Sequence, residues 1–425
     1  MCLSRQELAE LVNAWIWEHH DKKVVAASAN WIGQLERGRI RWPGRLYREA
    51  LRAIFDVSTD AALGFVNARA RRAVVKLEDE DVKRRQAIHT VTGLGVGALI
   101  QGPPAALLQS SSEPTPIPRR VGVTDIEQVR TATRVVLSWG STYGGGGLAR
   151  ETVMAQLRWS DSLLEATCPD RLRPELFCAV GELAAVAGYI AEDAGAPDQA
   201  GRVYRYALSC VEEADDWPLR AEVLSSMAKQ AIRLGRPDEG LTLAEQGLVR
   251  SDRLSVAGRS RLHTDRGRAL AKMRRVSETM AAIGTADDHF AHFAPDHEPL
   301  FLARHNPARH ALLAGQPLAD LAILGGDPGE ATKRLTAAAA GHDDYPRTRA
   351  ICLTKLAILT MTTGDPLHAA TIGHTALNAA GTLRSHLAAE ELRELARCTA
   401  PHQHHDEVAH LRHRIGTLLR RTDSP

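Results

Sequence analysis

The chain has 425 residues, which is long for one compact core and indicates two or three domains. Hydrophobic residues make up 44% and charged residues 24% of the chain, proportions that argue against a disordered polypeptide and against a membrane protein. Aromatic residues make up only 4%, so the core must consist mainly of Ala, Leu and Val, which suits helices packed on helices. We therefore expect an all-α fold.

The net charge of +2 hides a local excess of positive charge. Residues 1–72 contain twelve Lys and Arg against eight Asp and Glu, and four of the seven tryptophans lie within the first 42 residues. Between residues 37 and 52 a single acid, Glu49, accompanies six arginines: Arg37, Arg39, Arg41, Arg45, Arg48 and Arg52. The pattern predicts a small basic module joined to a large, nearly neutral one.

Cysteine usage and the N-terminus favour a cytoplasmic protein. The cysteines form no C-x-x-C pair, so neither a disulfide framework nor a zinc ribbon is predicted. Residues 1–10 lack the layout of a secretory signal. Arginines 84 and 85 precede an apolar run, 91–100, as in a twin-arginine export signal, but this run is about half of a bilayer span. A buried linker helix is therefore favoured over export or membrane anchoring.

Three helices are predicted at the N-terminus. Residues 3–20 have helical apolar spacing and begin with a capping box formed by Ser4 and Glu7. A second helix is expected over about 28–37, ending at Gly38, and a third opens near Pro43.

The second and third helices each separate apolar from polar residues. In the second, Ile32 and Leu35 point one way, with Ser28 between them, while Asn30, Gln34 and Arg37 point the other way. In the third, the arginines fall off an apolar stripe that consists of Leu46, Tyr47, Ala50, Leu51, Ile54 and Phe55.

Composition divides the chain into three segments. Residues 1–72 form the basic module, and residues 73–120 read as a charged helix followed by a Pro- and Ser-rich linker. Residues 121–425 have a helical pattern to the end.

Short turn motifs repeat within the last segment. The motif at 195–198 recurs forty residues later at 235–238, and the one at 326–328 recurs at 364–366. Residues 273–275 lie at the right distance for a degenerate copy without Gly and Pro. Each full motif precedes an amphipathic Ala/Leu-rich helix, which predicts an α-solenoid of helix pairs. The alternative is an irregular helical bundle with similar turns.

Two N-terminal stretches resemble a known family. L-S-R-Q-E-L-A-E-L-V-N (3–13) and N-W-I-G-Q-L-E-R-G (30–38) are similar to the second and third helices of Cro-repressor-like (XRE) helix-turn-helix proteins. The continuation, 39–52, resembles an actinobacterial branch of that family with a longer turn between these helices and a C-terminal tetratricopeptide-like (TPR-like) region.

The resemblance implies base-facing positions at Ser28, Ala29, Asn30 and Gln34. Asn and Gln amides can pair with adenine, whereas Ala29 could meet only a thymine methyl. The flanking arginines Arg37, Arg39, Arg41, Arg45 and Arg48 would neutralise phosphates, with a solvated surface as the alternative. Trp31 is expected to pack in the core rather than insert into DNA.

The family has a helix before the first of these stretches, whereas only Met1 and Cys2 precede it in this sequence. The resemblance therefore implies either that the true start lies upstream or that the apolar face of the first helix is covered by the linker or another subunit.

Other motifs favour structural readings. The segments around His289 and His292 and around His410 and His413 are read as surface polar residues rather than metal sites, since neither has a zinc-protease or finger pattern. The glycines at 144–147 and at 93, 95 and 97 are read as turn or helix-packing residues, because no phosphate-loop ending follows them.

These observations predict a sequence-specific transcriptional regulator without catalytic residues, metal or cofactor. Its partners would be double-stranded DNA, a peptide, small molecule or protein sensed by the solenoid, and a second copy of the chain, with no membrane. The alternative is a TPR-like interaction scaffold without autonomous DNA binding.

Overall fold

The computed structural model describes residues 4–20, 25–36, 40, 43–55, 57, 63, 116–295, 298, 302, 305–342, 345–381 and 384–422. All regular elements in these ranges are helices, which confirms the all-α class. The chain divides into two compact units, residues 1–76 and 77–425. This division falls inside the predicted helix and linker at 73–120, of which 73–115 lie outside the described residues.

The described residues of unit 1 form three helices at the predicted places: α1 (Arg5–His19), α2 (Ala29–Glu36) and α3 (Arg45–Ile54). The capping box is confirmed, since Ser4 Oγ accepts a hydrogen bond from the Glu7 amide and the Ser4 amide donates to the Glu7 carboxylate at 2.7 Å. Such reciprocal bonds satisfy two amides that the first turn leaves without partners.

The core of unit 1 lies between α1 and the other two helices. Its buried members are Ala9, Val12, Ile16, Ala27, Ile32, Ala50 and Leu51. Trp31 packs on this cluster and lies 4.6 Å from Tyr47 between ring centroids, so the prediction that it is a packing residue is confirmed. One assignment to the apolar stripe of the third helix was wrong, since Phe55, just past the end of α3, is 47% exposed.

Unit 2 is helical from Val123 to Thr422, as predicted. Its α-helices are α6 (Val123–Tyr143), α7 (Leu148–Leu163), α8 (Arg173–Asp193), α9 (Pro197–Glu213), α10 (Trp217–Arg233), α11 (Pro237–Leu248), α12 (Val256–Lys272), α13 (Val276–Phe290), α14 (Pro307–Ile323), α15 (Gly329–Ala340), α16 (Pro346–Thr363), α17 (Pro366–Ala380), α18 (His386–Cys398) and α19 (Asp406–Thr422). Short 3-10 turns occur at Asp170–Leu172, Ser251–Arg253 and Ala400–His402.

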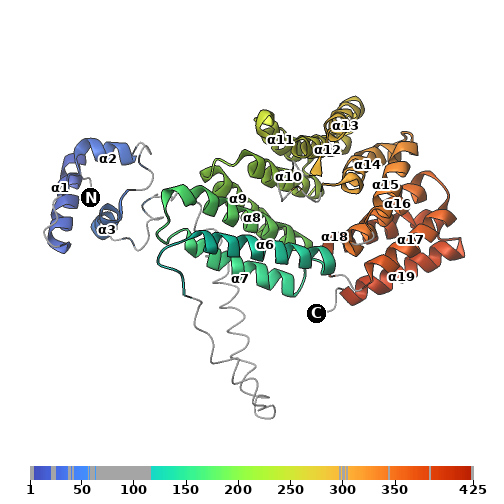
Figure 1. Cartoon of the computed structure of the whole chain (residues 1–425), viewed down its shortest axis with the longest axis horizontal. Coiled ribbons are helices and arrows are strands. Elements are labelled where there is room, and N and C mark those ends of the chain that lie inside the picture. The colour runs from blue at the N-terminus through green and yellow to red at the C-terminus, as the bar shows by residue number, and fades with distance from the viewer. Residues whose placement is uncertain are drawn as a thin grey trace, which may run out of the picture. The chain divides into compact units, whose positions relative to one another are not determined.

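Consecutive helices of unit 2 pack against each other in pairs, α8 with α9 through α18 with α19, and successive pairs follow one another around the unit (Figure 1). The first helices of neighbouring pairs also contact one another, as α10 does with α12 and α12 with α14. Each pair therefore buries part of its surface against the next.

The turns within several of these pairs share one backbone geometry. After α8, the Gly195 amide donates to the Glu192 carbonyl and the Ala196 amide to the Ala191 carbonyl, which is a Schellman motif. The same two bonds recur after α10 and α12. The residue in the left-handed region is Gly195 (φ 76°), Gly235 (φ 74°) or, in the copy without glycine, Arg274 (φ 60°).

The turn after α14 repeats the same two bonds, from the Gly325 amide to the Ala322 carbonyl and from the Gly326 amide to the Leu321 carbonyl. Its left-handed residue is Gly325 (φ 106°), one residue before the glycine that the sequence motif aligned. Gly364, after α16, has φ −136° and lies outside the left-handed region. The sequence repeats therefore mark the turns between helices, but only some of them share a conformation.

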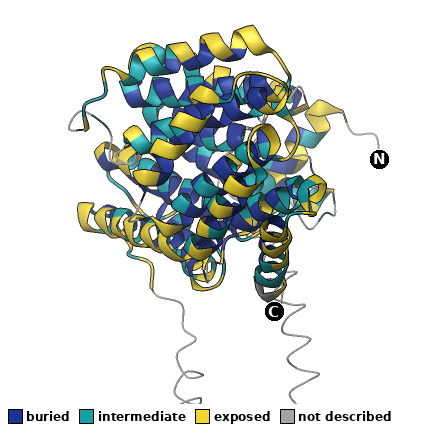
Figure 2. Cartoon of the chain, turned by 90° about the vertical axis from the view of Figure 1, so that its right-hand side faces the viewer, coloured by how far each residue is buried: buried dark blue, intermediate teal, exposed yellow. Residues whose placement is uncertain are grey.

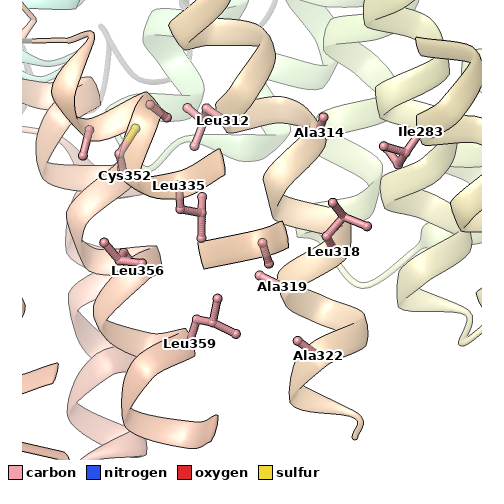
Figure 3. Packing of buried hydrophobic residues seen from close by; sticks show 13 residues of the cluster. Ile283, Leu312, Ala314, Leu318, Ala319, Ala322, Leu335, Cys352, Leu356 and Leu359 are labelled. Atoms are coloured by element: carbon pink, nitrogen blue, oxygen red, sulfur yellow. The ribbon is translucent and has the colours of Figure 1, made fainter. Parts of the chain in front are cut away.

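Buried residues lie on the sides of the helices that face one another, and exposed residues lie on the outer sides (Figure 2). One cluster joins four successive helices of unit 2 (Figure 3): Ile283 lies on α13, Leu312 and Leu318 on α14, Leu335 on α15 and Leu356 on α16. Small residues such as Ala314, which is fully buried, let these helices approach closely.

The last helices of unit 2 contact the first. The carboxylate of Asp193, at the end of α8, is fully buried and accepts hydrogen bonds from Arg347 at 2.7 Å, Ser385 at 2.6 Å and the Gly145 amide at 2.7 Å. A Cβ atom at Gly144 (φ 90°) would lie 2.3 Å from the carbonyl oxygen of Arg384. The glycines at 144–147 thus form a turn in close contact with a distant segment, which agrees with their reading as turn or packing residues.

Candidate nucleic-acid interface and interior cavity

The predicted base-facing residues lie at the beginning and along one side of α2. Ser28 precedes the helix, and its hydroxyl accepts a hydrogen bond from the Trp31 amide at 3.3 Å. Asn30 is exposed and Gln34 is half-buried, whereas Ile32 and Gly33 are buried. Because the core residues and the amide side chains occupy different sides, α2 can stay packed on unit 1 while presenting the amides.

The side-chain amides of Asn30 and Gln34 make no hydrogen bond with other described residues. Ala29 is half-buried and offers only a methyl group. The two amides therefore retain the donor and acceptor pair that contact with an adenine edge requires.

The described arginines of the basic module differ in their surroundings. Arg45 is 77% exposed and its Nε lies 3.5 Å from the Glu49 carboxylate. Arg48 is half-buried, and its Nε donates to the Pro43 carbonyl at 2.9 Å. Arg37, Arg39 and Arg41 lie outside the described residues.

Asn13 positions α2 and was not predicted from the sequence. Its side chain donates to the Ala27 carbonyl and accepts from the Ala27 amide, both at 2.9 Å. These two bonds hold the segment before α2 against α1. The side-chain amide of Asn13 pairs with both backbone polar groups of Ala27, as the peptide groups of a neighbouring β-strand would. An Asn on the half-buried side of an amphipathic helix was the only sequence signal.

A second candidate site is a cavity of about 340 Å³ in unit 2. It is lined mainly by the first helix of each pair, from α6 through α8, α10, α12, α14 and α16 to α18. Sequence reasoning predicted that the solenoid senses a ligand but named no residue that binds it, because the lining is assembled from helices far apart in the chain. Volumes of this order hold small ligands.

Several buried polar groups face this cavity. Lys229 is 8% exposed, and burial, followed by the nearby Arg261, lowers its pKa to about 7. His305 is 2% exposed, and burial followed by Arg261 lowers its pKa to about 2, so this imidazole is neutral. Neither ring nitrogen of His305 has a hydrogen-bond partner among the described residues.

The histidine-rich segments are engaged in protein contacts where they are described. Asp287 forms an ion pair with Arg334 and contacts the Nε2 atom of His310, each at 2.7 Å, and the ring of His289 stacks on His263. Within the described residues, no group of three or more His, Cys, Asp or Glu side chains could hold a metal ion. Asp296 and His297 lie outside them.

One described segment, residues 170–193, is long and apolar enough to cross a membrane by length and composition alone. Its most apolar window is 67% buried against the rest of the unit, as expected for a core helix. The apolar run at 91–100 lies outside the described residues.

No family model, curated protein or solved structure matches the chain.

Proposed function

We propose that this chain is a DNA-binding transcriptional regulator in which unit 1 is a helix-turn-helix module and unit 2 is a TPR-like α-solenoid that senses an effector. The observation that carries the proposal is the division of α2, where Ile32 is buried in the core and Asn30 is exposed. A recognition helix needs this division, because one side must pack while the other enters the major groove.

The resemblance of residues 3–13 and 30–38 to Cro-repressor-like proteins supports the same assignment. The excess of basic residues around α3 suits the phosphates beside the groove. The regulator would be cytoplasmic, with no catalytic centre. One helix-turn-helix reads only a half-site, so we propose that the chain acts as a symmetric dimer on a pseudo-palindrome.

Selection of bound sequences from a random duplex pool by the full-length chain tests the proposal. The chain should enrich one sequence, and the combined substitutions Asn30→Ala and Gln34→Ala should weaken binding to that sequence by roughly 30-fold or more. This loss follows from about 1–3 kcal/mol for each amide–base pair. Binding to random duplex should fall much less.

The matched control is Lys333→Ala, which removes an 80% exposed cation from α15 in unit 2 and should leave binding to both DNAs unchanged. An equal loss on both DNAs in the double variant would overturn the base-reading assignment. If no sequence is enriched, the scaffold without autonomous DNA binding becomes the better account.

A further inference from the structure

The cavity of unit 2 is lined by an excess of basic side chains. Seven Lys and Arg residues line it, against five glutamates. Four of the basic residues form ion pairs: Arg233 with Glu192, Arg261 with Glu222, Arg347 with Asp193 and Lys355 with Glu391. The other three are Lys229, Arg268 and Arg309.

Lys229 and Arg309 form the part of the lining whose positive charge is least compensated. Neither side chain makes a hydrogen bond or ion pair with another described residue. Arg268 has three acids near it, Asp320, Glu391 and Asp265, which act to raise its pKa, although burial and Arg233 lower it overall. Lys229 is buried and Arg309 is half-buried. A cation that is withdrawn from water without an ion-pair partner is costly, so a negative charge placed between these two groups would be stabilised.

The two cations lie close enough to affect each other. The groups that act on Lys229 are Arg261 and Arg309, which lower its pKa, and Asp265 and Glu222, which raise it. Both acids are already engaged, Glu222 with Arg261 at 2.6 Å and Asp265 with the Ser225 hydroxyl at 2.5 Å. Burial is the largest influence on the pKa of Arg309 and lowers it, as does the adjacent Arg261.

The neutral His305 adds a hydrogen-bonding group at the same place, since Arg309 and Lys229 are both among the charges that lower its pKa. Apolar side chains complete the wall. Arg309, Leu312 and Leu313 are spaced three and four residues apart on α14 and therefore share one side of that helix, while Ile351 lies on α16.

We propose that the cavity binds a small organic anion whose carboxylate or phosphate group lies between Lys229 and Arg309 and accepts a hydrogen bond from His305. Its apolar part would pack against Leu312, Leu313 and Ile351. A volume of about 340 Å³ suits a small molecule and is too small for a folded partner. A small organic anion would then be the effector that unit 2 senses under the proposed function. The anion site itself does not depend on that function; only an effect of the anion on DNA affinity does.

Proton uptake accompanies binding of this anion. A negative charge beside Lys229 favours its ammonium form and raises its pKa from about 7. Binding between pH 7 and 8 therefore takes up a proton. The affinity for the anion should fall as the pH rises above about 7, by up to about tenfold per pH unit. Above this pH the amine is mostly neutral, and it must take up a proton before it can pair with the anion.

Calorimetric titration of the full chain tests the proposal with three probes that share one alkyl chain: hexanoate, hexyl phosphate and the uncharged hexanamide. Runs at pH 7.5 in two buffers of different ionisation enthalpy measure the proton uptake. At least one anion should bind at least about tenfold more tightly than the amide, a difference of about 1.4 kcal/mol. Binding of hexanoate alone would assign a carboxylate, and binding of hexyl phosphate alone a phosphate.

The variants Lys229→Met and Arg309→Met should each weaken binding of the preferred anion at least about tenfold, and Lys229→Met should abolish the proton uptake. The matched control Lys333→Met, at an exposed position on α15, should bind as the unsubstituted chain does. Because Lys229→Met removes an unpaired buried charge, loss of folding is not the expected cause of its weaker binding.

Three results would overturn the proposal. Hexanamide could bind as tightly as the anions, or both cavity variants could bind the anion as the parent does. Neither anion could show binding even at a tenfold or greater molar excess over the protein. DNA is absent from these titrations. If an anion binds in the cavity and leaves DNA affinity unchanged, the site stands and the sensing role fails.

Discussion

Lys229 is expected to lower the stability of the folded chain and, in the proposed anion site, to favour ligand binding. Its amine is buried among Arg261, Arg309 and His305, and its pKa lies near 7 instead of the ordinary 10.5. Between these two values the unfolded chain holds a proton that the folded chain lacks. The free energy of unfolding should therefore rise as the pH increases from about 7 to 10. Below pH 7 the folded chain also holds the proton, and the full destabilisation by the buried ammonium group is present.

Lys229→Met should raise the free energy of unfolding of unit 2 at pH 7 by roughly 2–5 kcal/mol and should have little effect near pH 10.5. Denaturant unfolding at both pH values, followed by circular dichroism, measures the change. A variant that is no more stable than the parent at pH 7 would contradict the account of an uncompensated ammonium.

At the same scale, sequence identifies packing residues better than it identifies cavity residues. The packing of Trp31 and Ile32 could be predicted from helical spacing, because the apolar side of a short helix must pack against the core of its domain. Lys229 does not, because its surroundings come from α12 and α14, more than thirty residues away. A lysine on an amphipathic helix reads as solvent-facing unless the partner helices are known.

At the scale of elements, α2 is short and depends on its neighbours. An eight-residue helix is marginal by itself, so its place is set by packing on α1 and by the two bonds from Asn13 to Ala27. Asn13 therefore controls how α2 is presented without belonging to the candidate DNA-contacting surface.

Asn13→Ala should lower the free energy of unfolding of unit 1 by about 1–3 kcal/mol, because it leaves the Ala27 amide and carbonyl without their partner. Affinity for specific and random DNA should fall together, since the whole of α2 is displaced. Tryptophan fluorescence during denaturation follows unit 1 through Trp15 and Trp31, which pack on this core, while Trp139, Trp159 and Trp217 report a separate transition of unit 2 that should not change.

Asn13→Asp is the matched control, because it keeps the acceptor for the Ala27 amide and loses only the donor. It should fall between the parent and the alanine variant. Unaltered unfolding of unit 1 in Asn13→Ala would show that the side chain does not hold α2 in place.

Element boundaries were predictable where local chemistry sets them. The capping box at Ser4 and the Schellman turns at Gly195 and Gly235 are each determined within about six residues of sequence. The turn at Arg274 uses the same geometry without glycine, and an L-residue in the left-handed region is unfavourable by about 1 kcal/mol. Packing of α12 against α13 sets that turn, so local sequence alone gave only a degenerate match.

At the scale of unit 2, the sequence does not predict the closing contact, in which Asp193 on α8 joins Arg347 and Ser385 near the end of the unit. Asp193 and Arg347 are 154 residues apart, and Ser385 is farther still. Nothing local distinguishes these side chains from surface polar residues, yet their contact brings the first and last helices together around the cavity. Arg347 both lines the cavity and forms this contact, so the ligand site and the closing contact share one residue.

For the molecule as a whole, the central claim is that unit 1 binds the backbone and bases of duplex DNA. The most direct test measures the affinity of the full-length chain for random-sequence duplex at several salt concentrations. Five or six phosphate contacts predict a slope of about −5 in the plot of log affinity against log salt. Binding that is undetectable at low salt, or whose slope is near zero, would contradict the claim.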